Sequence, residues 1–199
     1  MDFSKLYEMW TIGKRMALHV EAVDEIADSC ALYAAQWRPS SPIVFRSKKG
    51  ASGSRAYDLI GTTHVILKLI SARVVSALAP FTGWTTYPVE VYGRKGELIP
   101  GYRGLAVTGR CGPIDNRRSQ PRICPPPVPQ GQPVRRWFGL YFDSATWDGS
   151  DVFVPEGTGL TVVTEAVKVA LQHNKITNVE FCQLTEAENA SSALLFSKR

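Results

Sequence analysis

Asp143, Asp148 and Asp151 form a close group of carboxylates in the sequence, beside Trp147 and Gly149. Neighbouring carboxylates can bind a divalent cation or transfer protons in acid–base catalysis. The spacing lacks the alternating aspartates of a calcium-binding loop. Asp and Gly are also preferred in tight turns, because an Asp side chain can hydrogen-bond to the local backbone. The pattern therefore favours a turn, while an enzyme that uses these carboxylates stays open as an alternative.

Other residue types that could do chemistry are scattered. His19, His64 and His173 lie far apart and fit no metal-binding histidine motif. Cys111 follows Arg110, whose charge could lower the pKa of the thiol, but no histidine is near it in the sequence. The glycines fit neither a dinucleotide-binding fingerprint nor a P-loop. We predict no metal site, no cofactor and no catalytic residue, and therefore not an enzyme.

A second chemical feature is a cluster of arginines in the middle of the chain. Proline is frequent in residues 112–133, including three consecutive prolines, and proline cannot donate to a helix or a central strand. We expect a long loop there, extended in part as polyproline II. The arginines inside and beside it are candidates for binding a partner. They are Arg110, Arg117, Arg118, Arg122, Arg135 and Arg136.

The overall charge allows more than one partner. The formal net charge is +5 and the isoelectric point is about 9.1, which suits nucleic acid or an acidic protein. A second basic stretch, Arg46 to Arg55, is rich in Gly and Ser. Solvated loops that keep the protein soluble explain both basic stretches equally well.

Composition indicates one globular domain spanning residues 1–199. Hydrophobic residues make up 44% and charged residues 21%, which excludes a mainly disordered chain. No apolar run reaches the roughly 20 residues that cross a bilayer, and the N-terminus lacks the pattern of a secretory signal. The four cysteines are far apart, which favours reduced thiols and a cytoplasmic protein. They are Cys30, Cys111, Cys124 and Cys182.

The apolar periodicity divides this domain into three parts. Helical spacing from Val20 to Trp37 predicts a helix and makes residues 1–40 a helical segment. Residues 41–185 form the expected core, and residues 186–199 a polar tail that frays. Within the core we predict strands at 42–45, 84–92, 137–142, 152–154 and 178–184.

Two helices in the core have similar surroundings. Ser71 and Thr164 each look like a helix N-cap, and each is followed by the same Val, Ala and Leu stripe, a short break and a strand. The pattern fits a duplicated strand–helix–strand unit, and it also fits any capped amphipathic helix that leads into a sheet. Both interpretations predict an α+β fold with short helices on a mainly antiparallel sheet.

Three stretches together resemble a family of immunity proteins of bacterial polymorphic toxins, the eleventh catalogued immunity family and formerly a domain of unknown function. They are 83–91, 99–109 and 148–153 with its continuation at 164–167 and 177–181. These motifs consist of caps, turns and core positions, so they mark a fold, and no catalytic residues come with the resemblance. It implies a non-enzymatic protein that neutralises a cognate toxin by binding it.

The sequence therefore leads to one main hypothesis and two alternatives. The main hypothesis is a protein-binding module in which the arginines of residues 110–136 contact an acidic toxin surface. The first alternative is a nucleic-acid-binding module that uses the same basic region together with Trp137 or Tyr141. The second is the carboxylate enzyme. A membrane partner is not expected.

Overall fold

The fold is α+β, as the sequence predicts. The computed structural model describes residues 2–48, 50, 53–115, 117–126 and 131–190, without the side chains of 134, 135, 189 and 190. Three short α-helices pack on mixed, mostly antiparallel sheets. None of the described helices is long and apolar enough to cross a membrane.

The strands are numbered in chain order. They are β1 Leu6–Thr11, β2 His19–Ala22, β3 Ile43–Ser47, β4 Leu59–Thr62, β5 Lys68–Ser71, β6 Trp84–Tyr92, β7 Tyr102–Val107, β8 Gly109–Cys111, β9 Gln120–Cys124, β10 Val134–Phe138, β11 Val152–Pro155, β12 Val162–Thr164, β13 Val179–Gln183 and β14 Glu188–Ala190. The helices are α1 Ser29–Tyr33, α2 Ala72–Leu78 and α3 Glu165–His173, with 3₁₀ turns η1 Phe3–Lys5 and η2 Ser144–Thr146.

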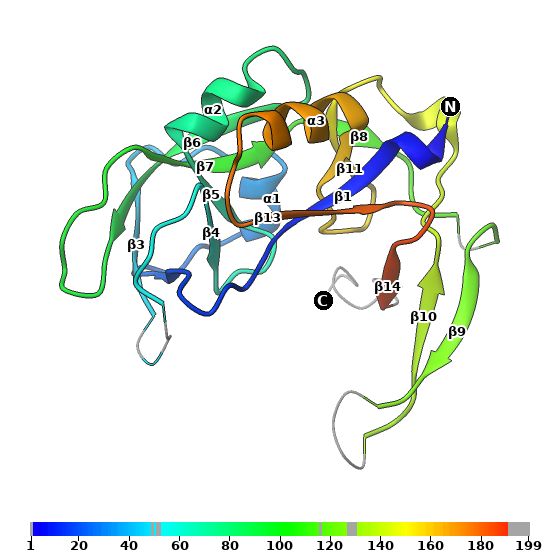
Figure 1. Ribbon diagram of the computed structural model, residues 1–199, viewed down its shortest axis with the longest axis horizontal. Helices are drawn as coiled ribbons and strands as arrows, with labels where there is room; N and C mark the ends of the chain where they lie inside the picture. Colours follow the sequence, from blue (N-terminus) through cyan, green and yellow to red (C-terminus); the bar gives the residue numbers. More distant parts are fainter. Residues whose placement is uncertain (1, 49, 51–52, 116, 127–130, 191–199) are drawn as a thin grey trace.

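Three sheets are built from these strands. Six strands close into a barrel in the order β2-β3-β6-β7-β5-β4. Five strands form an open sheet in the order β13-β1-β12-β11-β8. The remaining three form a small sheet, β14-β10-β9, which extends away from the rest of the molecule (Figure 1). Helices α2 and α3 lie next to each other along one side of the two larger sheets.

The barrel and the open sheet contain the same five-strand pattern. In the barrel, β2 runs parallel to β4, and β4, β5, β7 and β6 follow with antiparallel pairing. In the open sheet, β8 runs parallel to β11, and β11, β12, β1 and β13 follow in the same way. Helix α2 joins β5 to β6, and α3 joins β12 to β13. The two halves therefore have one topology, which supports the duplication that the repeated helices suggest.

The two halves exchange one strand. In chain order, β1 precedes the other strands of the first half, yet it lies in the sheet of the second, between β12 and β13. Strand β7 precedes those of the second half, yet it lies in the barrel between β5 and β6. Neither sheet is complete without a strand from the other half.

Apolar side chains form two clusters. The larger fills the barrel and continues under α2 and α3, with Phe45, Ile60 and Leu105 fully buried. The smaller joins the open sheet to the start of the three-stranded sheet through Phe142 and Phe153, whose rings meet edge to face at 5.6 Å.

The predicted N-terminal helical segment is wrong. Residues 1–40 contain β1 and β2, and the helix expected from Val20 to Trp37 shrinks to α1. Val20 pairs with β3 and β4, so the barrel takes up its backbone hydrogen bonds. The side chain of Asp28 then starts α1 by accepting from the amide of Ala31 at 2.8 Å. Val23, which the periodic pattern places inside, is 43% exposed.

The described part of the proline-rich stretch contains a strand that the sequence does not predict, and residues 116 and 127–130 lie outside the described residues. Residues 120–124 form β9, so residues 112–133 are not one long loop. Because β9 is the last strand of its sheet, Pro121 lies on an edge, where proline is tolerated. The strand expected at 137–142 begins earlier and ends at Phe138, before Gly139 turns the chain with φ +71°. Part of the predicted polar tail pairs with β10 as β14, and residues 191–199 lie outside the described residues.

Candidate functional site

Two of the three clustered aspartates stabilise local turns, and the third joins distant segments of the chain. Asp143 accepts from the amide of Ala145 at 3.0 Å and begins η2. Asp148 accepts from the amides of Ser150 at 2.9 Å and Arg110 at 2.7 Å. Asp151 accepts from the amide and hydroxyl of Thr82, both at 2.9 Å. The turn interpretation is therefore confirmed for Asp143 and Asp148, whereas Asp151 binds a segment that is distant in the sequence.

The pKa of Asp148 agrees with this structural role. Burial alone would raise the pKa, but the hydrogen bonds from Ser150 and Arg110 outweigh burial and lower it. A carboxyl group that acts as a general acid near neutral pH needs the opposite shift.

Thiol and metal chemistry receive no support at the places considered in the sequence. Cys111 is buried, and burial, followed by the charge of Asp148, raises the pKa of its thiol to about 12. All four cysteines are free thiols. Within the described ranges, no three His, Cys, Asp or Glu side chains are grouped so that they could hold a metal ion.

The side chain of Arg110 is half-buried and makes hydrogen bonds within the protein. Its guanidinium group donates to the carbonyl oxygens of Val107 and Gly109, both at 2.7 Å, and to that of Ala34 at 2.5 Å. These bonds tie the end of the α1 segment to the junction of β7 and β8. Arg110 therefore has a structural role, and its predicted role in partner binding stays a prediction.

Most of the other arginines lie on or beside the three-stranded sheet, which we call the arginine arm (β9, β10 and β14 with Arg118). Arg118 lies over the rings of Phe3 and Tyr141, with its guanidinium carbon 5.0 and 4.7 Å from their centroids. Arg122 lies 3.7 Å from the centroid of the Phe138 ring. Stacking on an aromatic face holds a guanidinium group in place while its edge stays able to donate.

The remaining arginines of the cluster differ in what they contact. Arg136 forms an ion pair with Glu188 at 3.1 Å across β10 and β14. Arg117 is exposed beside the arm. Arg135 is paired with Ile123 along the backbone, and its side chain lies outside the described part of the structure. Ile123 itself is 71% exposed on the edge strand β9.

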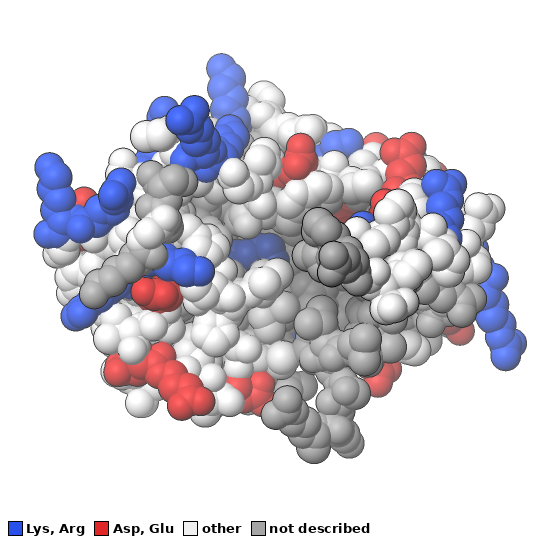
Figure 2. All heavy atoms as spheres, turned by 90° about the horizontal axis from the view of Figure 1, so that it is seen from below, with Lys and Arg blue, Asp and Glu red and all other residues white. Residues whose placement is uncertain are grey.

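A second basic surface lies at one end of the barrel, where sequence reasoning placed only solvated loops. Two adjoining pockets of about 500 and 610 Å³ share Lys48 and Gly50. We call them the cationic cleft. Its basic side chains are Lys14, His19, Arg46, Lys48 and Arg94. Figure 2 shows Lys and Arg side chains gathered at this end of the molecule, on the left of the view.

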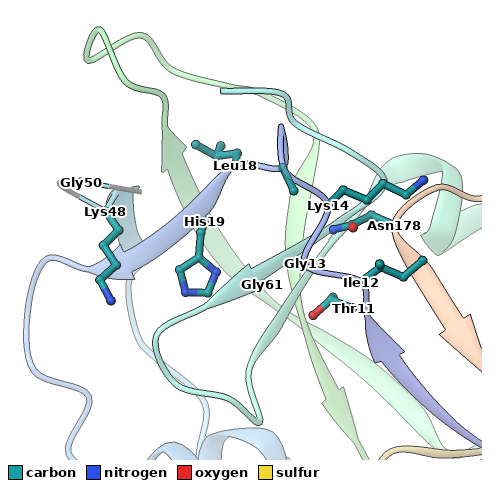
Figure 3. Close-up of a pocket in the computed structure, with 11 residues that line it drawn as sticks. Thr11, Ile12, Gly13, Lys14, Leu18, His19, Lys48, Gly50, Gly61 and Asn178 are labelled. Atoms are coloured by element: carbon teal, nitrogen blue, oxygen red, sulfur yellow. The ribbon is translucent and has the colours of Figure 1, made fainter. Parts of the chain in front are cut away.

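The barrel strands bring the cleft residues together from distant positions. His19 extends from β2 and Lys48 from the residue that follows the neighbouring strand β3, and Lys14 lies across the pocket near Asn178 (Figure 3). Burial, followed by the nearby charge of Lys48, lowers the pKa of His19. The arrangement can accept an anion. No local sequence motif predicts this arrangement, because His19 and Lys48 come together only when β2 pairs with β3.

The chain matches no protein family model and no curated protein. The resemblance to the toxin-immunity family, which depends on caps and turns, therefore remains a prediction.

Proposed function

We propose that the protein is a non-enzymatic binding module that recognises a protein partner through the arginine arm. The observation that carries the proposal is the stacking of Arg118 and Arg122 on aromatic rings beside the exposed Ile123. Arginine and aromatic side chains are enriched at protein interfaces, and groups already held in place lose less entropy on binding.

The free edge of β9 strengthens this proposal. In the described part of the chain, β9 pairs with β10 on one side and with no strand on the other. A partner can add a strand to such an edge, and main-chain hydrogen bonds then add to the side-chain contacts. The expected partner presents acidic side chains around an apolar spot that covers Ile123.

The resemblance to immunity proteins gives this partner an identity to test. A toxin of the bacterium that makes the protein is the expected partner, and the arm would cover or distort its active surface. The compartment that suits this role is the cytoplasm, where a toxin must be neutralised.

The test is affinity capture from a lysate of the source organism, with and without nuclease, read by mass spectrometry. The arm variant is Arg117→Glu with Arg122→Glu, and the control is Lys14→Glu with Lys48→Glu, which changes the net charge equally. We expect one dominant protein that survives nuclease treatment and disappears only with the arm variant. A protein captured equally by both variants would contradict the arm as the binding surface.

A nucleic-acid partner is the second candidate, and the cationic cleft favours it more than the arm does. Trp137 and Tyr141 are half-buried, and Arg118 covers the Tyr141 ring, so bases have little open aromatic face to stack on. The cleft instead gathers positive charge that phosphates could neutralise. This candidate predicts that captured nucleic acid is lost with the Lys14 and Lys48 variant and at higher salt.

A further inference from the structure

Lys68 is a buried amine at the junction of the two halves. It is the first residue of β5 and is 5% exposed. Its Nζ atom donates to the hydroxyl of Thr161 at 3.0 Å and lies 5.6 Å from the ring centroid of Tyr33. Among the residues that the structure describes, no ion pair includes Lys68.

This environment changes the protonation of the amine. Burial lowers the pKa of Lys68 to about 8, although the negative charge of Glu8 opposes the shift. An ordinary lysine, with a pKa near 10.4, is almost entirely protonated at pH 8, whereas about half of such an amine is neutral. Only the neutral form is a nucleophile, so the buried environment of Lys68 favours nucleophilic attack by this amine at mildly alkaline pH.

The amine borders a pocket of about 550 Å³. Trp10, Val65 and Leu160 supply apolar wall, and Glu8 and Thr161 supply polar groups. Burial raises the pKa of Glu8, so its carboxyl group keeps a proton to higher pH than usual. An apolar pocket with a few polar groups and shifted pKa values is the usual form of a small-molecule site.

The two halves differ at this pocket, although they match elsewhere. Lys68 occupies the position that Thr161 has in the second half, 93 residues further along the chain. The register of β1 and β7 places Glu8 opposite Val162 and Gly104 opposite Leu69, so Gly104 is the counterpart of Glu8. The amine of Lys68 and the carboxyl group of Glu8 therefore have no equivalents at the matching positions of the other half. A site that arose after duplication would show such a difference between the halves.

We propose that this pocket is a covalent binding site for a small carbonyl compound with an apolar body, which Lys68 holds as an imine. The neutral amine attacks the carbonyl carbon, and the C=O π electrons move to oxygen. After proton transfer from nitrogen to oxygen, the carbinolamine loses its hydroxyl group as water, with the departing oxygen protonated by Glu8. The nitrogen proton then returns to Glu8, so no oxidant or reductant is needed and water is the only by-product.

The experiment uses the intact protein with benzaldehyde as the probe and cyanoborohydride to reduce the imine, followed by peptide mass mapping from about pH 6 to about pH 10. We expect Lys68 to be the most heavily labelled lysine, with half-maximal labelling near pH 8. Labelling spread over the exposed lysines, with Lys68 unmodified or no faster than they are, would overturn the proposal.

Three variants test which residues are responsible for the labelling. Lys68→Met removes the dominant label, whereas Lys95→Met, at an exposed turn, leaves the label on Lys68 unchanged. Glu8→Gln moves the labelling midpoint to lower pH, because the Glu8 charge raises the pKa of Lys68. An unshifted midpoint contradicts the role of Glu8. If Lys68→Met fails to fold, the position of the label in the wild-type protein decides the question.

Discussion

Asp58 and Asp151 occupy equivalent places in the two halves, and each binds a threonine of the opposite half. Asp58 accepts from the amide and hydroxyl of Thr177 at 2.9 and 2.7 Å. Asp151 accepts from the amide and hydroxyl of Thr82, both at 2.9 Å. Each aspartate also accepts from the hydroxyl of the residue that begins the helix of its own half. The halves are therefore joined reciprocally, by the same contact made twice.

Removal of Asp58 should weaken the fold more than removal of Asp151. Asp58 is 6% exposed and also pairs with Arg73 at 2.9 Å, whereas Asp151 is half-buried. Hydrogen bonds to a buried charged group are worth about 1.5–3 kcal/mol each, and their loss leaves Thr177 unpaired. We expect Asp58→Ala to lower the free energy of unfolding by about 3 kcal/mol and Asp151→Ala by about 1 kcal/mol in urea titrations. Equal losses of unfolding free energy in the two variants would mean that the deeper burial of Asp58 does not make its contact stronger than that of Asp151.

The buried amine of Lys68 should give the fold an unusual response to alkaline pH. Its folded pKa of about 8 lies below the unfolded value of 10.5, so the unfolded chain binds more protons between these values. The contribution of Lys68 to the free energy of unfolding is therefore lowest below pH 8, and it rises as the pH increases from about 8 to 10.5. Lys68→Met removes the penalty, which is on the order of 3 kcal/mol near neutral pH.

The measurement is the difference in unfolding free energy between Lys68→Met and the wild-type protein at several pH values. Other groups that titrate above pH 9 act on both proteins and cancel in the difference. The advantage of the variant should shrink as pH rises from about 8 to about 10. An advantage that does not depend on pH would show that the amine is not shifted.

Gly104 should tolerate no side chain. A Cβ atom there would lie 2.0 Å from the Cε2 and Cζ atoms of the Tyr87 ring, which is buried in the barrel. Such overpacking commonly costs about 1–3 kcal/mol, and the closeness of this contact puts Gly104→Ala at the upper end. Gly13→Ala is the matched control, because nothing lies within 4 Å of its added Cβ. Thermal melts should separate the two variants clearly, and similar melting temperatures would contradict the packing of Tyr87 on β7.

Local patterns predicted part of this fold. The helices after Ser71 and Thr164 are confirmed because their signals lie within a few residues of each other. The side chain of Ser71 caps its helix as predicted, whereas the hydroxyl of Thr164 donates to Asp151 and makes no cap bond. The helix from Val20 to Trp37 is wrong because pairing of β2 with two distant strands outweighs a modest helical period. The exchange of β1 and β7 could not be predicted, because it depends on contacts between residues that are far apart in the sequence.

The functional residues were harder to predict. The arginines were found because they are close in sequence, but the guanidinium group of Arg110 also donates to the carbonyl oxygen of Ala34, which only the folded chain brings to it. Lys68 was missed because one lysine in an apolar strand carries no motif. Its chemistry comes from burial and from the pocket formed with Glu8 and Thr161.

The central claim, that the arginine arm binds a protein partner, is tested most directly by hydrogen exchange on the complex with the captured protein. The account predicts slower amide exchange in residues 120–124, because the partner covers the edge of β9, and unchanged exchange in the barrel strands β2 and β3. Protection around Lys14, His19 and Lys48 with none in β9 would contradict it and would assign recognition to the cationic cleft instead.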